Sequence, residues 1–359
     1  MPAVTSTMTT DVVIGVDTHK DVHVAVALDF LGARLATTTI PVGAKGYQAL
    51  DTWAAALGPI RAFGIEGTGS YGSGLSRFLR KQGHVVLEVS RPNRQLRRQK
   101  GKSDAVDAEN AARVVLAGQA TGQPKSGTGT AEMIRHLKVA RDTAVRGRTQ
   151  AMQTLKALIV SAPDALREEL ERATGRMALL RRLAAMRPGP LTSTLASAKT
   201  SLRAIARRWL ALDAEIREHD VHLGALTTAR APELLKAYGM GTDTAAEMLL
   251  VVGDNPERIH SEAAFAKLCG ACPIPASSGK TNRHRLNRGG NRQANATLYR
   301  VVIVRLRGHQ PTLDYVRRRT AEGKSKAEII RCLKRYVARE IYGYLCSQPR
   351  PVSQPGSVH

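Results

Sequence analysis

Four acidic residues are the feature of this sequence best suited to carry chemistry. Asp17 ends the apolar run VVIGVD, and Glu66 ends a second apolar run, AFGIE. Asp104 and Asp107 follow in KSDAVDAENAARV, at a spacing that puts both on one face of a helix. Mg²⁺ prefers hard oxygen ligands, and two such ions can activate a nucleophile and stabilise a leaving oxygen in phosphoryl transfer. The four acids therefore predict a divalent-metal site that acts on nucleic-acid phosphate.

The alternative for these acids is a set of ordinary turn and helix-surface residues. One Asp-Thr or Glu-Gly-Thr turn would be weak evidence, and Asp21 and Glu109 are further acids close by in the sequence. The order of the four, each at the expected end or face of its element, favours the metal site.

The charge of the chain points to a polyanionic partner. The 359 residues include 54 Lys and Arg against 30 Asp and Glu, which gives a formal net charge of +24. Such an excess favours salt-dependent binding of nucleic acid. Aromatic residues make up only 4%, which argues against an extended platform for stacking single-stranded bases.

The first third of the chain predicts a mixed α/β sheet. Runs rich in Val, Ala, Ile and Thr alternate with helical patterns, and the helix that carries Asp104 and Asp107 extends to about Gly118. The expected strands are residues 11–17, 22–28, 33–41, 61–66 and 84–90, with a helix over 45–57.

The middle of the chain is expected to be helical, after a linker over 121–130. A heptad seam alternates spacings of three and four. It consists of Leu202, Ile205, Trp209, Leu212, Ile216, His219, Leu223 and Leu226. This seam could pair with the helix around Leu155 or with another subunit.

The last third predicts helices around a long basic loop, PIPASSGKTNRHRLNRGGN, with later helices over 291–307 and 324–346. Gly239-Met240-Gly241 resembles a helix-hairpin-helix turn, although a simple turn between packed helices explains it as well. The expected domains are 1–122 for the sheet, 123–230 for the linker and coiled coil, 231–348 for the helical domain, and 349–359 for a disordered tail.

A pair of serines in the basic loop offers a second candidate site. Ser277 and Ser278 precede Gly279 and Lys280. A serine hydroxyl can attack a phosphodiester when a base or metal activates it. From the residues alone, a plain loop remains the stronger interpretation.

Basic residues near both sites are expected to contact nucleic-acid backbone. Close to the acids they are Arg91, Arg94, Arg97, Arg98, Lys100 and Lys102; close to the serines, Lys280, Arg283, Arg285, Arg288 and Arg292; further on, Arg317, Arg318 and Arg319. A solvated face is the alternative for the first of these groups.

Cysteine usage and hydropathy suggest a cytoplasmic protein; that it is bacterial and associates with the nucleoid when it acts is what the family resemblance described below implies. Four cysteines are too few for a disulfide scaffold, and no apolar run is long enough to cross a bilayer. Cys269 and Cys272 form a lone CxxC, which we interpret as packed residues at a helix end.

GVDTHKD, IEGTGSYG and KSDAVDAENAAR, followed by the basic loop with SSGK, resemble the DEDD transposases of insertion sequences, now called bridge-RNA-guided recombinases. The resemblance implies that Asp17, Glu66, Asp104 and Asp107 form the Mg²⁺ site, with Mn²⁺ as a substitute, of a RuvC-like domain of RNase H-like fold. A helical transposase domain follows it in that family.

The same resemblance implies a nucleophilic serine just before a glycine, which corresponds to Ser278, with Ser277 as the alternative. It also implies double-stranded DNA, both element ends and target, and a structured guide RNA as partners. We expect a dimer that pairs into a tetramer. The alternative functions are a metal-dependent, Holliday-junction-resolvase-like nuclease without a serine intermediate, and a non-catalytic nucleic-acid-binding protein.

Overall fold

The computed structural model describes residues 11–89, 103–120, 122–278 and 283–346. The chain divides into two compact units: Met1–Gly129 with Gly253–His260, and Thr130–Val252 with Ser261–His359. We describe each unit by itself. The expected tail over 349–359 lies outside the described residues.

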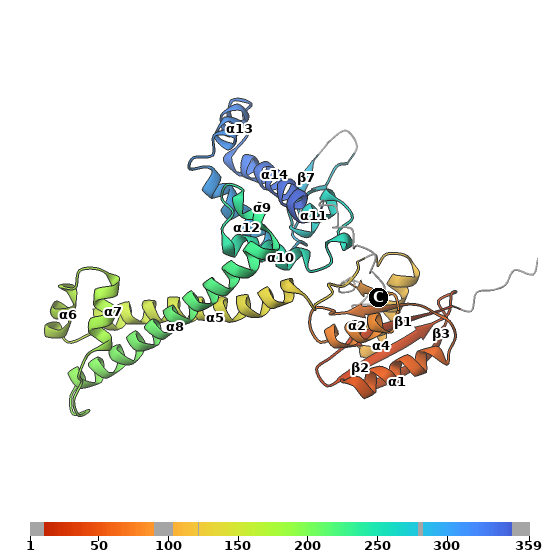
Figure 1. Ribbon diagram of the computed structural model, residues 1–359, viewed down its shortest axis with the longest axis horizontal. Coiled ribbons are helices and arrows are strands. Elements are labelled where there is room, and N and C mark those ends of the chain that lie inside the picture. Colours follow the sequence, from red (N-terminus) through yellow and green to blue (C-terminus); the bar gives the residue numbers. More distant parts are fainter. Residues whose placement is uncertain (1–10, 90–102, 121, 279–282, 347–359) are drawn as a thin grey trace, which may run out of the picture. The chain divides into compact units, whose positions relative to one another are not determined.

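The first unit is built on a five-stranded mixed sheet of RNase H-like fold, as predicted. Its strands are β1 Val12–Thr18, β2 Val22–Leu28, β3 Arg34–Pro41, β4 Ile60–Glu66 and β5 Val86–Val89. The strand order is β3-β2-β1-β4-β5 (Figure 1). β1, β2 and β3 pair antiparallel, whereas β4 pairs parallel with both β1 and β5. The carboxyl ends of β1 and β4 therefore meet at one edge of the sheet.

Helices cover both faces of this sheet, because successive strand residues point to opposite faces. Ile14, Val16 and Ile65 pack with α1, Ala44–Ala55, and α2, Ser73–Lys81. On the other face, residues such as Val13 and Ala62 pack against the small side chains of α4, Asp104–Leu116.

The helix α4 approaches the sheet at two glycines. A Cβ atom at Gly15 would lie 2.0 Å from the carbonyl oxygen of Ala108 and 2.4 Å from the nitrogen of Ala112. A Cβ atom at Gly64, on the neighbouring strand, would lie 2.9 Å from the carbonyl oxygen of Ala111. The helix backbone thus rests directly on the strands, where any side chain would hold it away.

A distant segment completes the first unit. The Asn255 side chain donates to the carbonyl oxygen of Pro124 at 3.0 Å and accepts from the Ser126 amide at 3.0 Å. Asp254 accepts from the Gly129 amide at 3.1 Å. These bonds fix the segment after α4, so the stretch predicted as a linker is held by side chains from much later in the sequence.

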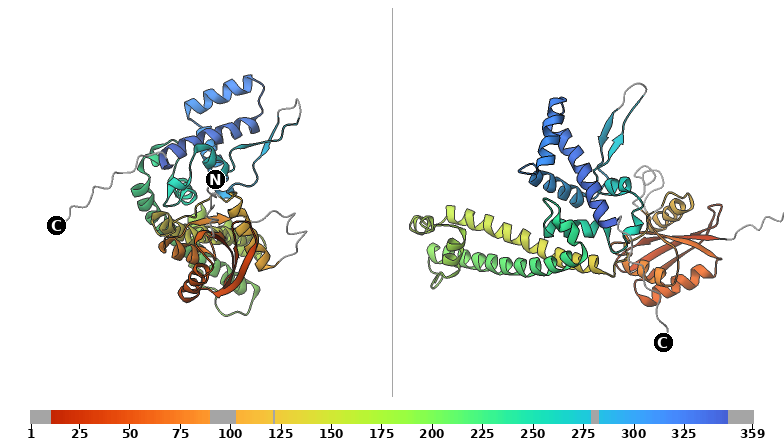
Figure 2. Two further views of the ribbon diagram at one scale, coloured as in Figure 1. Left: turned by 90° about the vertical axis from the view of Figure 1, so that its right-hand side faces the viewer. Right: turned by 45° about the horizontal axis from the view of Figure 1, so that its top comes forward.

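The second unit contains an antiparallel pair of long helices, α5 Thr130–Val160 and α8 Thr194–Arg230, with α6 Asp164–Glu171 and α7 Arg176–Ala184 between them. They lie side by side (Figures 1 and 2). Arg148 pairs with Asp213 at 2.5 Å and Arg141 with Asp220 at 2.7 Å.

The heptad seam of α8 faces α5 in the same chain. Leu202, Trp209, Ile216 and Leu223, one heptad apart, are buried, and the first two share a core cluster with Leu155 of α5. This decides between the two partners that the sequence left open. The other seam residues are only half-buried.

Six further helices of the second unit are described: α9 Pro232–Lys236, α10 Thr242–Val252, α11 Glu262–Leu268, α12 Arg292–Arg305, α13 Gln310–Ala321 and α14 Lys326–Cys346. The basic loop leads from α11 to α12. A short 3₁₀ helix, η1 Pro256–Arg258, belongs to the first unit. None of the helices described is long and apolar enough to span a membrane.

The structure corrects two expectations about the last third. The basic loop is a hairpin at its base, where β6 Pro273–Pro275 pairs antiparallel with β7 His284–Leu286. The helix α13 was not predicted; Thr312 is its one buried residue, so its sequence carries no apolar stripe.

Cys269 is buried at the end of α11, and burial raises the pKa of its thiol to about 12, which fits a packed residue.

We expect Gly15→Ala to lower the free energy of unfolding of the first unit by about 2 kcal/mol or more, because the new methyl group would overlap backbone atoms of α4. Chemical denaturation followed by circular dichroism measures this. Gly69→Ala is the control, since its Cβ atom would meet no atom within 4 Å. Equal stability of both variants would contradict the close packing of α4.

Candidate functional site

Asp17 and Glu66 lie next to each other at the end of the sheet. Val16 pairs with Ile65 across the parallel strands, so Asp17 and Glu66 are level at the following position. Alternation places them on the face that Gly15 and Gly64 present to α4. The Thr18 hydroxyl donates to the carbonyl oxygen of Glu66 at 2.8 Å and ties the two strand ends together.

The first turn of α4 supplies the other two acids. Ser103 caps the helix, and its hydroxyl accepts from the Val106 amide at 3.3 Å. Carboxylates are favoured in the first turn because the helix dipole is positive there. Since Ala108 and Ala112 lie against Gly15, the turn before them lies over the next residue of that strand face, Asp17.

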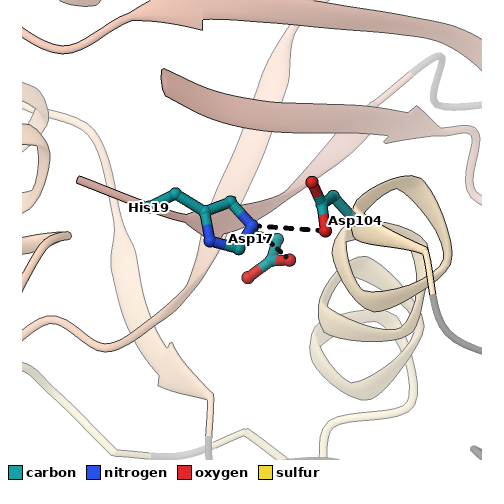
Figure 3. A group of neighbouring side chains, drawn as sticks. All are labelled: Asp17, His19 and Asp104. Carbon is teal, nitrogen blue, oxygen red and sulfur yellow. Dashed lines mark ion pairs between the residues drawn. The ribbon is translucent and has the colours of Figure 1, made fainter. Parts of the chain in front are cut away.

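His19 joins two of the predicted acids. Its Nε2 atom lies 3.2 Å from Oδ2 of Asp17 and 3.3 Å from Oδ1 of Asp104 (Figure 3). Ligand atoms of these three residues all lie within 4.8 Å of one another. Asp17 is buried, whereas the side chains of His19 and Asp104 are 43% and 51% exposed. The group is therefore open to solvent on one side.

The electrostatics of Asp17 show that the acids act on one another. Burial raises the pKa of the Asp17 carboxyl, His19 lowers it, and the charges of Asp107 and Asp104 raise it further, with a net rise. Like charges held this close disfavour ionisation, and a cation between them would relieve the repulsion.

The donor set fits a divalent metal ion. Carboxylate oxygens suit Mg²⁺ and Mn²⁺, and an imidazole nitrogen is compatible with Mn²⁺ and later transition metals. Among the described residues, the tight group contains Asp17 and Asp104 but neither Glu66 nor Asp107. Strand register places Glu66 beside Asp17. The buried Asp107 lies near enough for its charge to raise the pKa of Asp17.

Sequence reasoning did not single out His19. The signal was present, because a histidine two residues after a strand-end aspartate, in GVDTHKD, lies at the same sheet edge. Arg91, Arg94, Arg97, Arg98, Lys100 and Lys102, expected to bind nucleic acid beside this centre, lie outside the described residues.

The serine hairpin separates the roles of its two hydroxyls. The Ser277 hydroxyl accepts from the Arg283 amide at 3.1 Å and lies 3.3 Å from the Arg283 carbonyl oxygen, to which it can donate. It therefore closes the hairpin. Ser278 is exposed at the next position. Arg283, Arg285, Arg288 and Arg292 are exposed as well, and Lys280 lies outside the described residues.

The base of this hairpin is fixed by backbone contact. A Cβ atom at Gly290 would lie 2.3 Å from the nitrogen of Gly270, so the two chain segments touch. Asn287 donates to the carbonyl oxygen of Lys267 at 2.9 Å, and Asn295 donates to those of Cys269 and Gly270 at 3.0 and 2.9 Å. The end of α11 and the start of α12 thus hold the two strands between which the serines lie.

Two family models match this chain. Residues 14–162 match a model named for the DEDD transposases of IS110 and described as a transposase. Residues 231–317 match a model described as transposase of the IS116/IS110/IS902 family. The first match includes all four acids and the second includes both serines. No curated protein matches the chain significantly.

We expect Asp17→Asn and Asp104→Asn each to weaken Mn²⁺ binding by about tenfold or more, because each removes a charged oxygen ligand from a three-residue group. Isothermal titration calorimetry of the full-length protein measures this. Asp21→Asn, an exposed acid in the loop between β1 and β2, is the matched control. Equal losses in all three variants would contradict a defined centre.

We expect Gly290→Ala to loosen the serine hairpin, because the added methyl group would overlap the Gly270 backbone. Hydrogen exchange at the amides of Ile274 and of β7 should become at least several-fold faster, since Pro273 and Pro275 carry no amide hydrogen. Gly289→Ala is a close control, since the nearest atom to its Cβ would be Oδ1 of Asn287 at 3.5 Å. Unchanged protection in Gly290→Ala would argue against the clamp.

Proposed function

Because the chain belongs to the IS116/IS110/IS902 family of transposases, enzymes that cleave and join DNA, we propose that it excises and inserts an insertion sequence as a site-specific recombinase. The observation that carries this proposal is the convergence of Asp17 and Asp104, with Asp107, at the end of β1. Acids gathered in this way suit the handling of a phosphate.

The acids would hold Mg²⁺ when the protein acts on DNA. The bound metal would supply positive charge to stabilise the developing charge on the phosphate. The chain's own contribution is to position the carboxylates: Gly15 and Gly64 let α4 bring Asp104 and Asp107 to Asp17 and Glu66, and His19 spans Asp17 and Asp104.

Ser278 would act as the nucleophile. Its Oγ atom forms a bond to phosphorus as the bond from phosphorus to a DNA oxygen breaks; the serine gives up one proton and the leaving oxygen takes one up. The DNA strand is then joined to Ser278 through a phosphodiester. Because this link replaces the phosphodiester that was broken, a DNA hydroxyl can attack it and rejoin DNA without ATP. The engagement of the Ser277 hydroxyl with Arg283 supports Ser278 as the attacking residue. In this proposal Ser278 works beside the acids, contributed by a different subunit.

A guide RNA would select the DNA sites by base pairing. The support is the net charge of +24, which favours a polyanionic partner, together with the exposed arginines of the hairpin. The protein would then read the shape and backbone of the nucleic acid, and sequence choice would lie in the RNA.

We also propose that a dimer, pairing into a tetramer, holds the four DNA strand ends that recombination requires. The heptad seam of α8 does not support this assembly, because its buried positions are covered by α5 of the same chain. The proposal therefore rests on the reaction alone.

The expected test outcome concerns covalent attachment. With element-end DNA, RNA from the flank of the element and Mg²⁺, we expect a protein–DNA adduct on a denaturing gel. Ser278→Ala should abolish the adduct, whereas Ser277→Ala should retain it at a reduced level because its hairpin bond is lost. Free nicked DNA that persists in Ser278→Ala and disappears in Asp17→Ala would instead establish a metal-dependent nuclease.

A further inference from the structure

The helices α12, α13 and α14 enclose a cavity of about 330 Å³. These helices are drawn in blue (Figure 2). Val302, Leu333 and Val337 supply apolar lining, and Tyr315, Tyr336 and Arg318 add two aromatic rings and a cation. Ligand pockets range from about 300 to 1,000 Å³, so this one suits a single flat group better than an extended ligand.

Two tyrosines give the cavity its aromatic character. The rings of Tyr315 and Tyr336 meet edge to face, with centroids 5.4 Å apart and an angle of 80° between their planes. Tyr336 is 49% exposed although it lines the cavity. The chain has only 8 tyrosines and 4% aromatic residues, so this pair departs from its general composition.

Arg318 brings an uncompensated positive charge to these rings. Its guanidinium lies 5.5 Å from the centre of the Tyr315 ring. The flanking arginines are both neutralised: Arg317 pairs with Asp314 at 2.8 Å, and Arg319 pairs with Glu322. Within the described residues, Arg318 makes no such ion pair, and no carboxylate lines the cavity. An anion next to a flat ring would fit this arrangement.

The inner wall of the cavity is held in place by buried polar contacts. Arg305 donates to both carboxylate oxygens of Glu340, at 2.7 and 2.9 Å, and to the carbonyl oxygen of Tyr238 at 2.9 Å. His309 contacts the Thr312 hydroxyl at 2.8 Å at the start of α13. Arg305 and His309 are thus fixed before any ligand arrives, so this wall of the cavity needs no ordering on binding.

We propose that this cavity binds one unpaired nucleotide of a nucleic acid, with its base stacked on the tyrosine pair and its phosphate on Arg318. A flat aromatic group joined to a phosphate is the ligand that matches a ring pair beside a free arginine, and stacking accepts any base. The site uses neither the acidic centre nor Ser278. The nucleotide could come from RNA or from an unpaired DNA strand, because the shared chemistry is the same.

The test measures binding by the full-length protein, without metal, to hairpins that carry a single bulged 2-aminopurine, one of RNA and one of DNA. Fully paired hairpins of the same length are the reference probes. We expect stacking to quench the fluorescence of the bulged base. Tyr336→Leu should restore this fluorescence and weaken binding of the bulged hairpin by about tenfold, while binding of the paired hairpin stays unchanged.

Matched variants separate this effect from a general loss of structure. Tyr299→Leu removes a tyrosine of similar exposure, 47%, that does not line the cavity, and Tyr336→Phe keeps the ring; both should bind like the unchanged protein. Arg318→Gln should weaken binding of the bulged hairpin more than Arg317→Gln, which removes the same charge.

Quenching with only the RNA or only the DNA hairpin supports the site and identifies its source. The proposal is overturned if Tyr336→Leu quenches and binds the bulged probe as before, or loses affinity for paired and bulged probes alike. Because no cleavage is required, either result leaves the roles proposed for the acids and Ser278 to their own tests.

Discussion

The direct contact between α4 and two strand glycines is the constraint on which the acidic centre depends. Gly15 and Gly64 occupy neighbouring strands at the same level, and both would collide with α4 if they carried a side chain. A helix normally packs on a sheet through interdigitated side chains, which leaves its backbone further away. Here the backbone contact fixes the height and the register of α4. Its first turn, with Asp104 and Asp107, then has one position relative to Asp17.

A comparison of two acidic clusters in this chain shows why the one at β1 is the candidate for a metal. In the second unit Lys138 is buried among Asp142, Asp243 and Glu247, with its Nζ atom 2.8 Å from Asp243. That cluster carries its own cation, and these carboxylates keep the pKa of Lys138 raised despite burial.

Among the described residues, the half-exposed His19 pairs with both Asp17 and Asp104, and the pKa of Asp17 is raised by burial and by the charges of Asp107 and Asp104. An added cation would relieve the repulsion that raises the pKa of Asp17, whereas the ammonium of Lys138 is already part of its cluster and braces α5 against α10. The same residue types therefore serve different purposes in the two units.

Much of the sheet and most of the acidic centre could be predicted from the sequence. The β1, β2 and β4 strands are short apolar runs bounded by polar residues. Asp17 and Glu66 stand at the ends of two of these runs, and that position identifies them as candidates in the sequence. The position of His19, two residues after Asp17, is a signal in the sequence, but its contact with Asp104 depends on the distance between the end of β1 and the start of α4, which the sequence does not give. The partner of the α8 seam was undecided for a similar reason: the seam's spacing shows that it must be covered, but not by which helix. The α13 helix left no apolar pattern to detect, since it buries little beyond Thr312.

The serine hairpin and the acidic centre are positioned by the same physical device. Gly270 and Gly290 bring two backbone segments together under the hairpin, as Gly15 and Gly64 bring α4 onto the sheet. Where backbones touch, the position of a segment depends on main-chain geometry and hydrogen bonds, which have fewer alternatives than side-chain packing. Of the groups proposed to act on DNA, Asp104 and Ser278 are exposed and can meet a large substrate, whereas Asp17 and Asp107 are buried beside them. Glycine contacts beneath the surface fix the position of these segments. The short polar segments above the glycines keep the side chains accessible. We therefore expect residues that touch no substrate, such as Gly15 and Gly290, to matter for the proposed chemistry because they position the acids and the serine segment.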